Sequence, residues 1–151
     1  MNFSVLSRKN IKCFKTDLKH IIISASDPYD EPPIIPNQEN CLGTLRLKFH
    51  DWGETEKERI KKMESSPTAQ KQVFFSEEDA RKIVDFVANN IKNTDLIVCQ
   101  CDAGISRSSA MAAALSKYIT GSDEYFYKHY LPNSLVYRLL LNELHKGKVK
   151  V

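Results

Sequence analysis

The strongest constraint on the fold is a short apolar run that leads directly into a helix. Residues 95–100 read DLIVCQ, and a tight turn separates them from the alanine-rich stretch SSAMAAALSKYI, which Gly121 closes. A nearly continuous apolar run of this length is typical of a central strand that is covered on both faces. A buried strand followed by a helix favours a sheet with helices packed against it.

Other apolar runs predict the rest of the sheet and its helices. Further strands are expected at 3–6, 20–24 and 45–49, and the proline-rich stretch SDPYDEPPIIPNQEN between the second and third is expected to be a loop. Three more helices are predicted, and they are a charged one at 54–65, one capped by Ser76, and one after Pro132-Asn133. The predicted fold class is therefore α/β, with a central sheet flanked by helices.

Length and composition are typical of one soluble domain, and its small positive net charge suits a small anionic ligand. The 151 residues suit a single domain spanning 1–151, and 42% hydrophobic residues exclude disorder for most of the chain. No stretch approaches the roughly 20 apolar residues of a membrane span. The N-terminus is too polar for a signal peptide. A net charge of +3 is too balanced to favour nucleic acid. The four cysteines are read as thiols, so a location in the reducing cytoplasm is expected. The charge balance and the lack of an apolar span lead us to expect neither nucleic-acid nor membrane partners.

The chemically informative segment is the turn itself, residues 101–108. It connects the predicted central strand to a helix N-terminus, where unpaired N–H groups attract anions. Gly104 allows the loop to bend, and Arg107 can return its planar guanidinium to the same centre. Cys101 lies at the floor of this loop, where the same field favours the thiolate. Ser108 can donate a hydrogen bond to the sulfur. The alternative is a buried cysteine that precedes a helix, with Arg107 on the surface.

This segment resembles the signature of the cysteine-dependent protein tyrosine phosphatases, and its Ala-Gly-x-Ser-Arg-Ser form is most similar to the dual-specificity branch. Pro132-Asn133, with Tyr137 and Leu140 after it, resembles a second segment of that branch. The resemblance covers about 95–146. It implies that Cys101 is the nucleophile, Arg107 the phosphate clamp and Ser108 the hydroxyl behind the sulfur. The implied phosphate cradle is the backbone of Asp102, Ala103, Gly104, Ile105, Ser106 and Arg107.

Two positions depart from the family pattern. Gln100 stands where members usually carry a histidine that orders the loop and tunes the thiolate. Asp102 places an acid in the loop, where phosphatases of inositol lipids tend to carry basic residues. An acid there would repel a headgroup with several phosphates, so lipid substrates are ranked below phosphoproteins.

Asp51 is the predicted general acid. The family places an aspartate on a loop after a strand, upstream of the cysteine, and Asp51 follows the predicted strand at 45–49 with Gly53 close behind. Such an acid protonates the leaving oxygen and later acts as base on the hydrolytic water. Glu54, Asp27 and Asp30 are the rival candidates. The charged segment 54–72 is interpreted as an insertion, either a lid beside the site or a solvated surface helix.

The remaining reactive or aromatic residues are assigned structural roles. Strand alternation turns His50 away from Asp51, Trp52 is expected to anchor its loop, and Tyr29 is expected to be an exposed tyrosine. Cys99 is expected in the core of its strand, although a redox pairing with Cys101 is an alternative. Histidines 20, 129 and 145 are expected on the surface or in packing contacts. Neither a metal ion nor a cofactor is expected, since no second pair of ligands accompanies Cys99 and Cys101.

These residues predict a metal-independent phosphomonoesterase that forms a cysteinyl-phosphate. The expected substrate is phosphotyrosine in a protein or peptide, with phosphoserine and phosphothreonine as further candidates. Phosphate, sulfate or vanadate is the expected active-site anion. A catalytically weak phosphate-binding module is the main alternative, motivated by Gln100. A sulfur-transfer or arsenate-reducing enzyme is a third, disfavoured by the Ala-Gly-x-Ser-Arg-Ser form and by the late position of the motif.

Overall fold

The computed structural model describes residues 1–63 and 71–151 and has an entirely parallel sheet at its centre. Its order is β1 (Asn2–Leu6), β4 (Leu96–Gln100), β2 (His20–Ser26) and β3 (Cys41–Lys48). The four predicted strands are confirmed, as is the α/β class. Strand β3 begins at Cys41 instead of residue 45, because its first residues pair with β2 although they show little apolar alternation.

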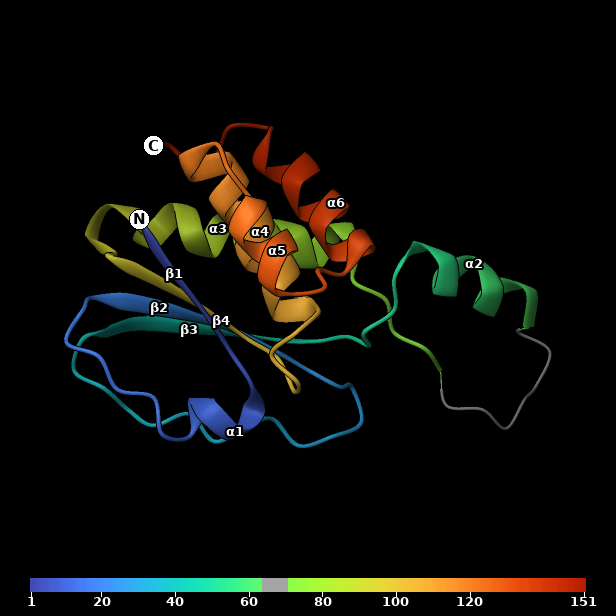
Figure 1. Cartoon of the computed structure of the whole chain (residues 1–151), viewed down its shortest axis with the longest axis horizontal. Coiled ribbons are helices and arrows are strands. Elements are labelled where there is room, and N and C mark those ends of the chain that lie inside the picture. Colours follow the sequence, from blue (N-terminus) through green and yellow to red (C-terminus); the bar gives the residue numbers. More distant parts are fainter. Residues whose placement is uncertain (64–70) are drawn as a thin grey trace.

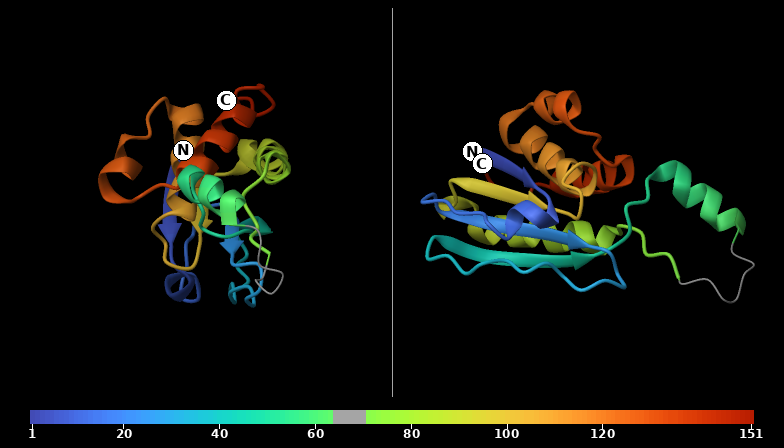
Figure 2. Two further views of the ribbon diagram at one scale, coloured as in Figure 1. Left: turned by 90° about the vertical axis from the view of Figure 1, so that its right-hand side faces the viewer. Right: turned by 60° about the horizontal axis from the view of Figure 1, so that its bottom comes forward.

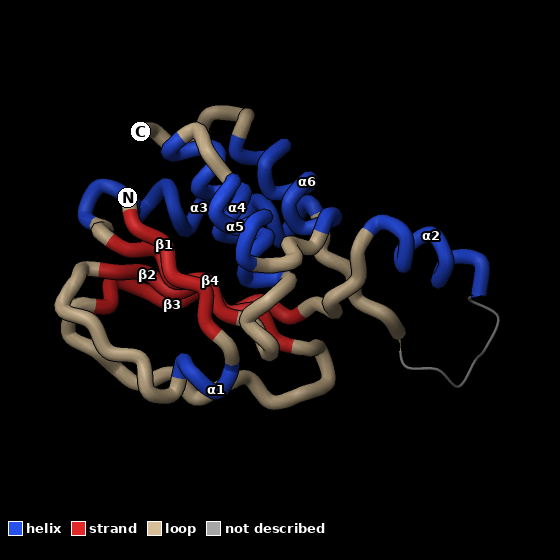
Figure 3. The backbone as a smooth tube through the Cα atoms, in the orientation of Figure 1, coloured by secondary structure: helices blue, strands red, loops and turns tan. Residues whose placement is uncertain are grey.

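Helices cover one face of the sheet, and a short helix with loops covers the other (Figures 1 and 3). The helical layer consists of α3 (Glu77–Asn90), α4 (Arg107–Thr120), α5 (Glu124–His129) and α6 (Ser134–Leu144). The opposite face carries α1 (Arg8–Ile11) and the loop before β3. In β4, Ile97 and Cys99 pack into the helical layer, while Leu96 and Val98 belong to the cluster around α1. The alternation of strand side chains thus gives β4 two apolar faces.

The ends of the long helices follow from local side-chain chemistry. The Ser76 hydroxyl accepts from the Asp79 N–H and the Asp79 carboxylate accepts from the Ser76 N–H, which makes a capping box for α3. Asn133 caps α6 by accepting from the Val136 N–H. Gly121 ends α4 with a φ of 88°, a conformation that glycine adopts without strain. Sequence reasoning did not predict α1, α5 or the 3-10 turn η1 (Ile91–Asn93), which are too short to show apolar periodicity.

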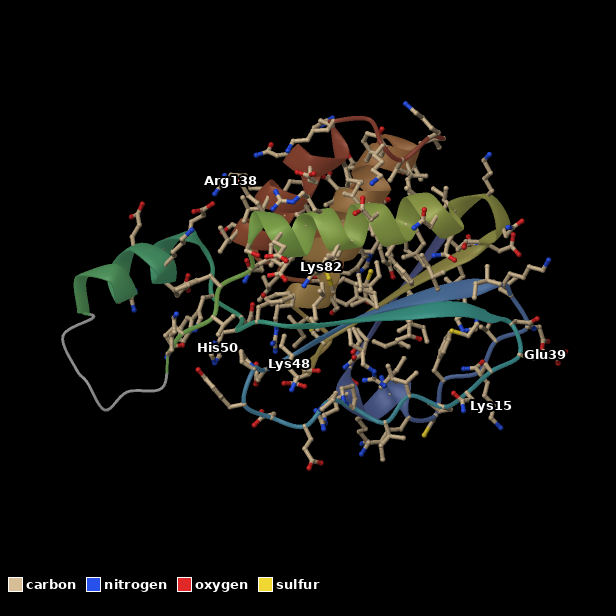
Figure 4. All side chains as sticks on the ribbon, turned by 180° about the vertical axis from the view of Figure 1, so that it is seen from behind. Lys15, Glu39, Lys48, His50, Lys82 and Arg138 are labelled. Carbon is tan, nitrogen blue, oxygen red and sulfur yellow. The ribbon has the colours of Figure 1, made fainter. Side chains whose placement is uncertain are left out.

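Helix α2 (Glu54–Met63) lies to one side of the layers (Figures 1 and 2). Its first residue forms an ion pair with Arg138 of α6. Figure 4 shows Lys48 and His50 at the end of β3, from which the chain passes to α2, and Arg138 on the neighbouring helical layer. The predicted insertion 54–72 therefore begins as a helix, and its residues 64–70 lie outside the described residues. Within the described parts of the chain, no helix has the length and apolar character needed to cross a membrane.

Candidate active site

The candidate site lies at the carboxyl edge of the sheet, where ligands bind in open parallel sheets. The loop 101–106 leaves the end of β4 there and leads into α4. The end of β1 and the start of α1 support the loop. The Cys101 N–H donates to the Leu6 carbonyl at 3.2 Å, and the Arg8 N–H donates to the Asp102 carbonyl at 3.0 Å. These two backbone hydrogen bonds fix the backbone of the loop.

Gly104 allows this close packing. Its φ is +71°, in the left-handed region, and a Cβ at this position would lie 2.7 Å from the backbone nitrogen of Ser7. The contact is with backbone, which cannot rotate away as a side chain can. Glycine is therefore required both for the bend and for the approach of the loop to the start of α1.

The floor of the loop is buried and holds the predicted nucleophile. Cys101 is 2% exposed, and its Sγ lies 3.0 Å from the Oγ of Ser108. Ser108 is fully buried in the first turn of α4, so the loop and the helix N-terminus bring the two side chains together. The structure thus places Ser108 next to the sulfur, as the motif suggested.

Arg107 is anchored along one edge of its guanidinium. Nη1 donates to Oδ1 of Asp27 at 2.8 Å and to the carbonyl of Phe49 at 2.9 Å. Nη2 lies 3.6 Å from Oδ2 of Asp102. The side chain is only 5% exposed, and its Nε has no hydrogen-bond partner among the described residues. The anchored edge fixes the orientation of the fork, while the Nε–H can serve an anion's oxygen.

Asp102 lies within a group of charged side chains on this side of the loop. Its carboxylate is 3.6 Å from Nη1 of Arg8, and carboxylate oxygens of Asp27, Asp30 and Asp102 lie within 4.8 Å of one another. Burial is the main cause that raises the pKa of Asp102, and the neighbouring Asp27 carboxyl adds to the shift. The two arginines oppose it. Asp27, a rival for the general acid, is thus engaged with Arg107.

Asp51 is held over the loop by two donors from distant segments. Its Oδ1 accepts from the Ser106 hydroxyl and from the Asn133 side-chain amide, both at 2.8 Å. The Asn133 N–H in turn donates to the Ser106 carbonyl at 3.1 Å. Both side-chain donors reach the same oxygen, so Oδ2 is the oxygen that can carry a proton. The sequence predicted Asp51 as a candidate acid but not its contact with Asn133, for which the Pro-Asn motif was the available signal.

Gln100 provides a hydrogen bond to the loop from the face of the sheet opposite the helices. Its Nε2 donates to the Cys101 carbonyl at 2.9 Å, and its Oε1 accepts from the Ser24 hydroxyl. The Cys101 carbonyl can only accept, so the nitrogen end of the amide has to face the loop. Both residues are buried. A neutral amide therefore orders the loop at the position where histidine is usual, and this amide does not titrate.

The segment around His50 contacts residues 71–73 and not the carboxylate of Asp51. The His50 N–H donates to the Val73 carbonyl at 2.7 Å, and His50 Nδ1 accepts from the Val73 N–H at 2.9 Å. The Trp52 indole N–H donates to Oε1 of Gln72, and the exposed Tyr29 donates its hydroxyl to the carbonyl of Lys71. These contacts anchor the chain on both sides of α2. Of the other two rival acids, Glu54 is paired with Arg138, and Asp30 lies in the group of carboxylates beside Asp102.

The four cysteines are free, and Cys99 is fully buried in β4. Burial, with a smaller contribution from the neighbouring Cys101, raises the pKa of the Cys99 thiol far above its usual range. Cys99 is therefore a core residue, as expected. His20 is buried beside Phe14 in the layer under the sheet, which agrees with the packing role expected for it.

Comparisons with known proteins give matches among solved structures. No family model matches the sequence, and comparison with the sequences of curated proteins gives no significant match. The human tyrosine phosphatase-like serine/threonine/tyrosine-interacting protein matches with a TM-score of 0.51 at 17% identity, over 85% of this chain and 78% of that one. PTPMT1, solved in complex with PI(5)P, matches with a TM-score of 0.54 at 16% identity, over 97% and 92%. The chain shares the fold of these two proteins.

The phosphatase fold confirms at the structural level the resemblance that the 95–146 segment suggested. It extends the similarity to the N-terminal half, where the sequence showed only the order of the elements. At these identities the similarity concerns the fold. The chemistry of this chain therefore has to be argued from the residues at the end of β4 and their neighbours.

Proposed function

We propose that the protein is a metal-independent phosphomonoesterase that works through a cysteinyl-phosphate. The observation that carries this proposal is the hydrogen bond between the Ser106 hydroxyl and Asp51 Oδ1 at 2.8 Å. It joins a carboxylate to the same loop that holds Cys101 and Arg107. A nucleophile, an anion clamp and a proton donor in one site are the parts that phosphoryl transfer requires.

In the first step, the Cys101 thiolate attacks the phosphorus, and the bond from phosphorus to the ester oxygen breaks. The backbone N–H groups of residues 102–107 and the Arg107 guanidinium would stabilise the charge on the transferring oxygens. Asp51, protonated at Oδ2, would give its proton to the leaving oxygen. A positioned acid of this kind is worth about 10²–10⁴-fold in rate.

In the second step, a water molecule attacks the cysteinyl-phosphate, and the sulfur–phosphorus bond breaks. Asp51, now a carboxylate, would take a proton from that water. The Ser108 hydroxyl, 3.0 Å from Sγ, would donate to the sulfur as the thiolate leaves. Inorganic phosphate is released, and Asp51 regains its proton for the next cycle.

We propose phosphotyrosine in proteins or peptides as the substrate, with phosphoserine and phosphothreonine as further substrates. The charges around the loop support this choice over inositol lipids. Carboxylates of Asp27, Asp30 and Asp102 gather beside Arg107, where they would repel additional phosphates of a headgroup. PTPMT1 was solved with PI(5)P, so a phosphoinositide is the comparison substrate for any test. We place this activity in the cytoplasm and in one domain spanning 1–151.

Hydrolysis of an aryl phosphate tests the proposal, measured from pH 5 to 8 in the presence of a chelator. Wild type, Cys101→Ser and Asp51→Asn are compared, with Cys13→Ser as the control because Cys13 is an exposed thiol far from the loop in sequence. We expect full activity in the control and none in Cys101→Ser. In Asp51→Asn we expect a rate lower by about 10²–10⁴-fold and a changed pH profile. Activity that survives in Cys101→Ser contradicts the mechanism.

A second candidate function is phosphate binding without turnover. Gln100 in place of histidine and the ion pair of Arg107 with Asp27 favour it, and one structural neighbour is named phosphatase-like. Wild type that binds vanadate but hydrolyses no aryl phosphate or phosphopeptide would establish this function instead.

A further inference from the structure

Two exposed apolar side chains form a shoulder beside the phosphate loop. Ile105, within the loop, is 46% exposed, and Leu131, before α6, is 76% exposed. The Leu131 N–H donates to the Ile105 carbonyl at 3.2 Å, so the two residues are direct neighbours. We call this pair the apolar shoulder. Single exposed apolar side chains are ordinary, whereas two adjacent ones at the edge of a candidate active site are a candidate contact surface.

The apolar shoulder is continuous with the residues that hold the general acid. One residue after Ile105 comes Ser106, and two residues after Leu131 comes Asn133, whose N–H donates to the Ser106 carbonyl at 3.1 Å. Both of these residues also donate to Asp51 Oδ1. A leaving group that receives a proton from Asp51 therefore exits the loop beside Ile105 and Leu131. The parts of a substrate next to the phosphorylated residue would lie over the shoulder.

We propose that the apolar shoulder binds an apolar side chain of a phosphopeptide substrate, two residues from the phosphorylated one. The inference rests on the proposed function, because it assumes that the loop holds the phosphate. In an extended peptide, side chains two residues apart point the same way and lie roughly 7 Å apart. When a phosphorylated side chain enters the loop, the side chain two residues away therefore also points toward the protein, at the rim of the loop.

The charge distribution favours a peptide over a membrane surface as the occupant. On the Arg107 side of the loop lie the carboxylates of Asp27, Asp30 and Asp102, and Asp51 lies beside the shoulder itself. An anionic lipid bilayer would bring its charged headgroups against these carboxylates. An apolar side chain of a peptide contacts only the shoulder and avoids that repulsion.

Binding of matched phosphotyrosine peptides to Cys101→Ser tests the inference without depending on turnover. The peptides differ only two residues before or after the phosphotyrosine, where they carry leucine, serine or glutamate. We expect the best leucine peptide to bind about tenfold more tightly than its serine counterpart, as partial burial of a leucine side chain predicts. Adding Leu131→Ser should reduce this preference to within about twofold.

The matched control adds Leu18→Ser to Cys101→Ser. Leu18 is also exposed, at 42%, but it precedes β2 and so lies at the opposite edge of the sheet from the loop. This control should keep the tenfold preference. Equal binding of all peptides by Cys101→Ser, or a preference that Leu131→Ser leaves intact, overturns the inference. A loss of binding to vesicles that contain phosphoinositides, caused by Leu131→Ser without a change in peptide preference, overturns it in favour of a lipid.

The same experiment separates the inference from the proposed function. Wild type that hydrolyses aryl phosphate but shows no leucine preference contradicts the shoulder alone. A leucine preference in a protein that shows no turnover supports the shoulder and contradicts the proposed enzyme. Peptides that do not bind at all contradict the shoulder, and the aryl phosphate assay then decides the function by itself.

Discussion

The two sides of the candidate site are built in different ways. The floor, with Cys101, Arg107 and Ser108, comes from one continuous strand, loop and helix, and its side chains are buried. The acid side brings together residues 51, 106 and 133 from three separate segments, and Asp51 is exposed. The floor is therefore fixed by the backbone of the fold, whereas the acid side depends on two side-chain hydrogen bonds. When Asp51 itself is left in place, substitutions on the floor should have larger effects than substitutions of the groups that hold Asp51.

Among substitutions that leave Cys101 and Asp51 in place, the largest effect is expected at Arg107. In Arg107→Lys a single ammonium group replaces the planar guanidinium, whose Nη1 is held by Asp27 and Phe49. The lysine therefore cannot be anchored at one nitrogen while it donates from another to the phosphate. We expect kcat/KM for an aryl phosphate to fall by about 10²–10³-fold. Asp27→Asn, which keeps an oxygen acceptor for Nη1, should reduce it by less than about tenfold. If kcat/KM falls by the same factor in both variants, the contact of Nη1 with Asp27, and not the second donor of the guanidinium, determines the activity.

Gly104→Ala tests the backbone of the floor, and Gly147→Ala is its matched control. Both glycines have positive φ, but a Cβ at 104 meets the backbone of Ser7 at 2.7 Å, while none of the described atoms lies within 4 Å of a Cβ at 147. We expect Gly147→Ala to lower the free energy of unfolding by about 1 kcal/mol through strain alone. Gly104→Ala should lower the free energy of unfolding by about 1–3 kcal/mol or more and should remove most of the activity. Equal losses in urea unfolding would show that the contact with Ser7 is unimportant.

Ser106→Ala tests the acid side. It removes one of the two donors to Asp51 and leaves the Asn133 amide in place. We expect kcat to fall by about tenfold for phenyl phosphate, since a hydrogen bond to a charged group is worth about 1.5–3 kcal/mol. For p-nitrophenyl phosphate the loss should be smaller, because that leaving group depends less on a proton donor. A uniform loss for both substrates would indicate damage to the loop instead of misplacement of the acid.

The smallest effect is expected from Asp102→Asn. The folded structure raises the pKa of Asp102, so this carboxyl loses a proton less readily in the folded than in the unfolded chain. Ionisation therefore costs stability as pH rises, and an uncharged asparagine avoids that cost. At pH 7 the variant should be more stable by at most about 1 kcal/mol. The difference should vanish below the ordinary value of 3.8, where both states hold the proton. A variant that is less stable at pH 7, measured by thermal unfolding, reverses the sign and contradicts the argument.

The same contrast explains what could be predicted from the sequence. The floor lies in one stretch, so the apolar run of β4, the bend at Gly104 and the helix start specify it locally, and the motif predicted that Ser108 lies next to the sulfur. The anchoring of Arg107 by Asp27 was not predicted, because it depends on which strands lie next to each other at the carboxyl edge. The pairing of Gln100 with Ser24 depends likewise on the register between β4 and β2. Such contacts between distant segments leave no local pattern.

The strand order also determines when the loop can form during synthesis. Strand β4 lies between β1 and β2, so without Ile97 of β4 Phe3 has no partner in the sheet, and Ile21 has a partner only in β3. Pairings between segments so far apart in the chain form slowly, because the intervening chain must first be ordered. As a nascent chain leaves the ribosome, β2 can pair with β3, but β1 stays unpaired until the segment that precedes Cys101 has emerged. Completing the sheet and building the phosphate loop are therefore one event, and a chain stalled before that point carries neither.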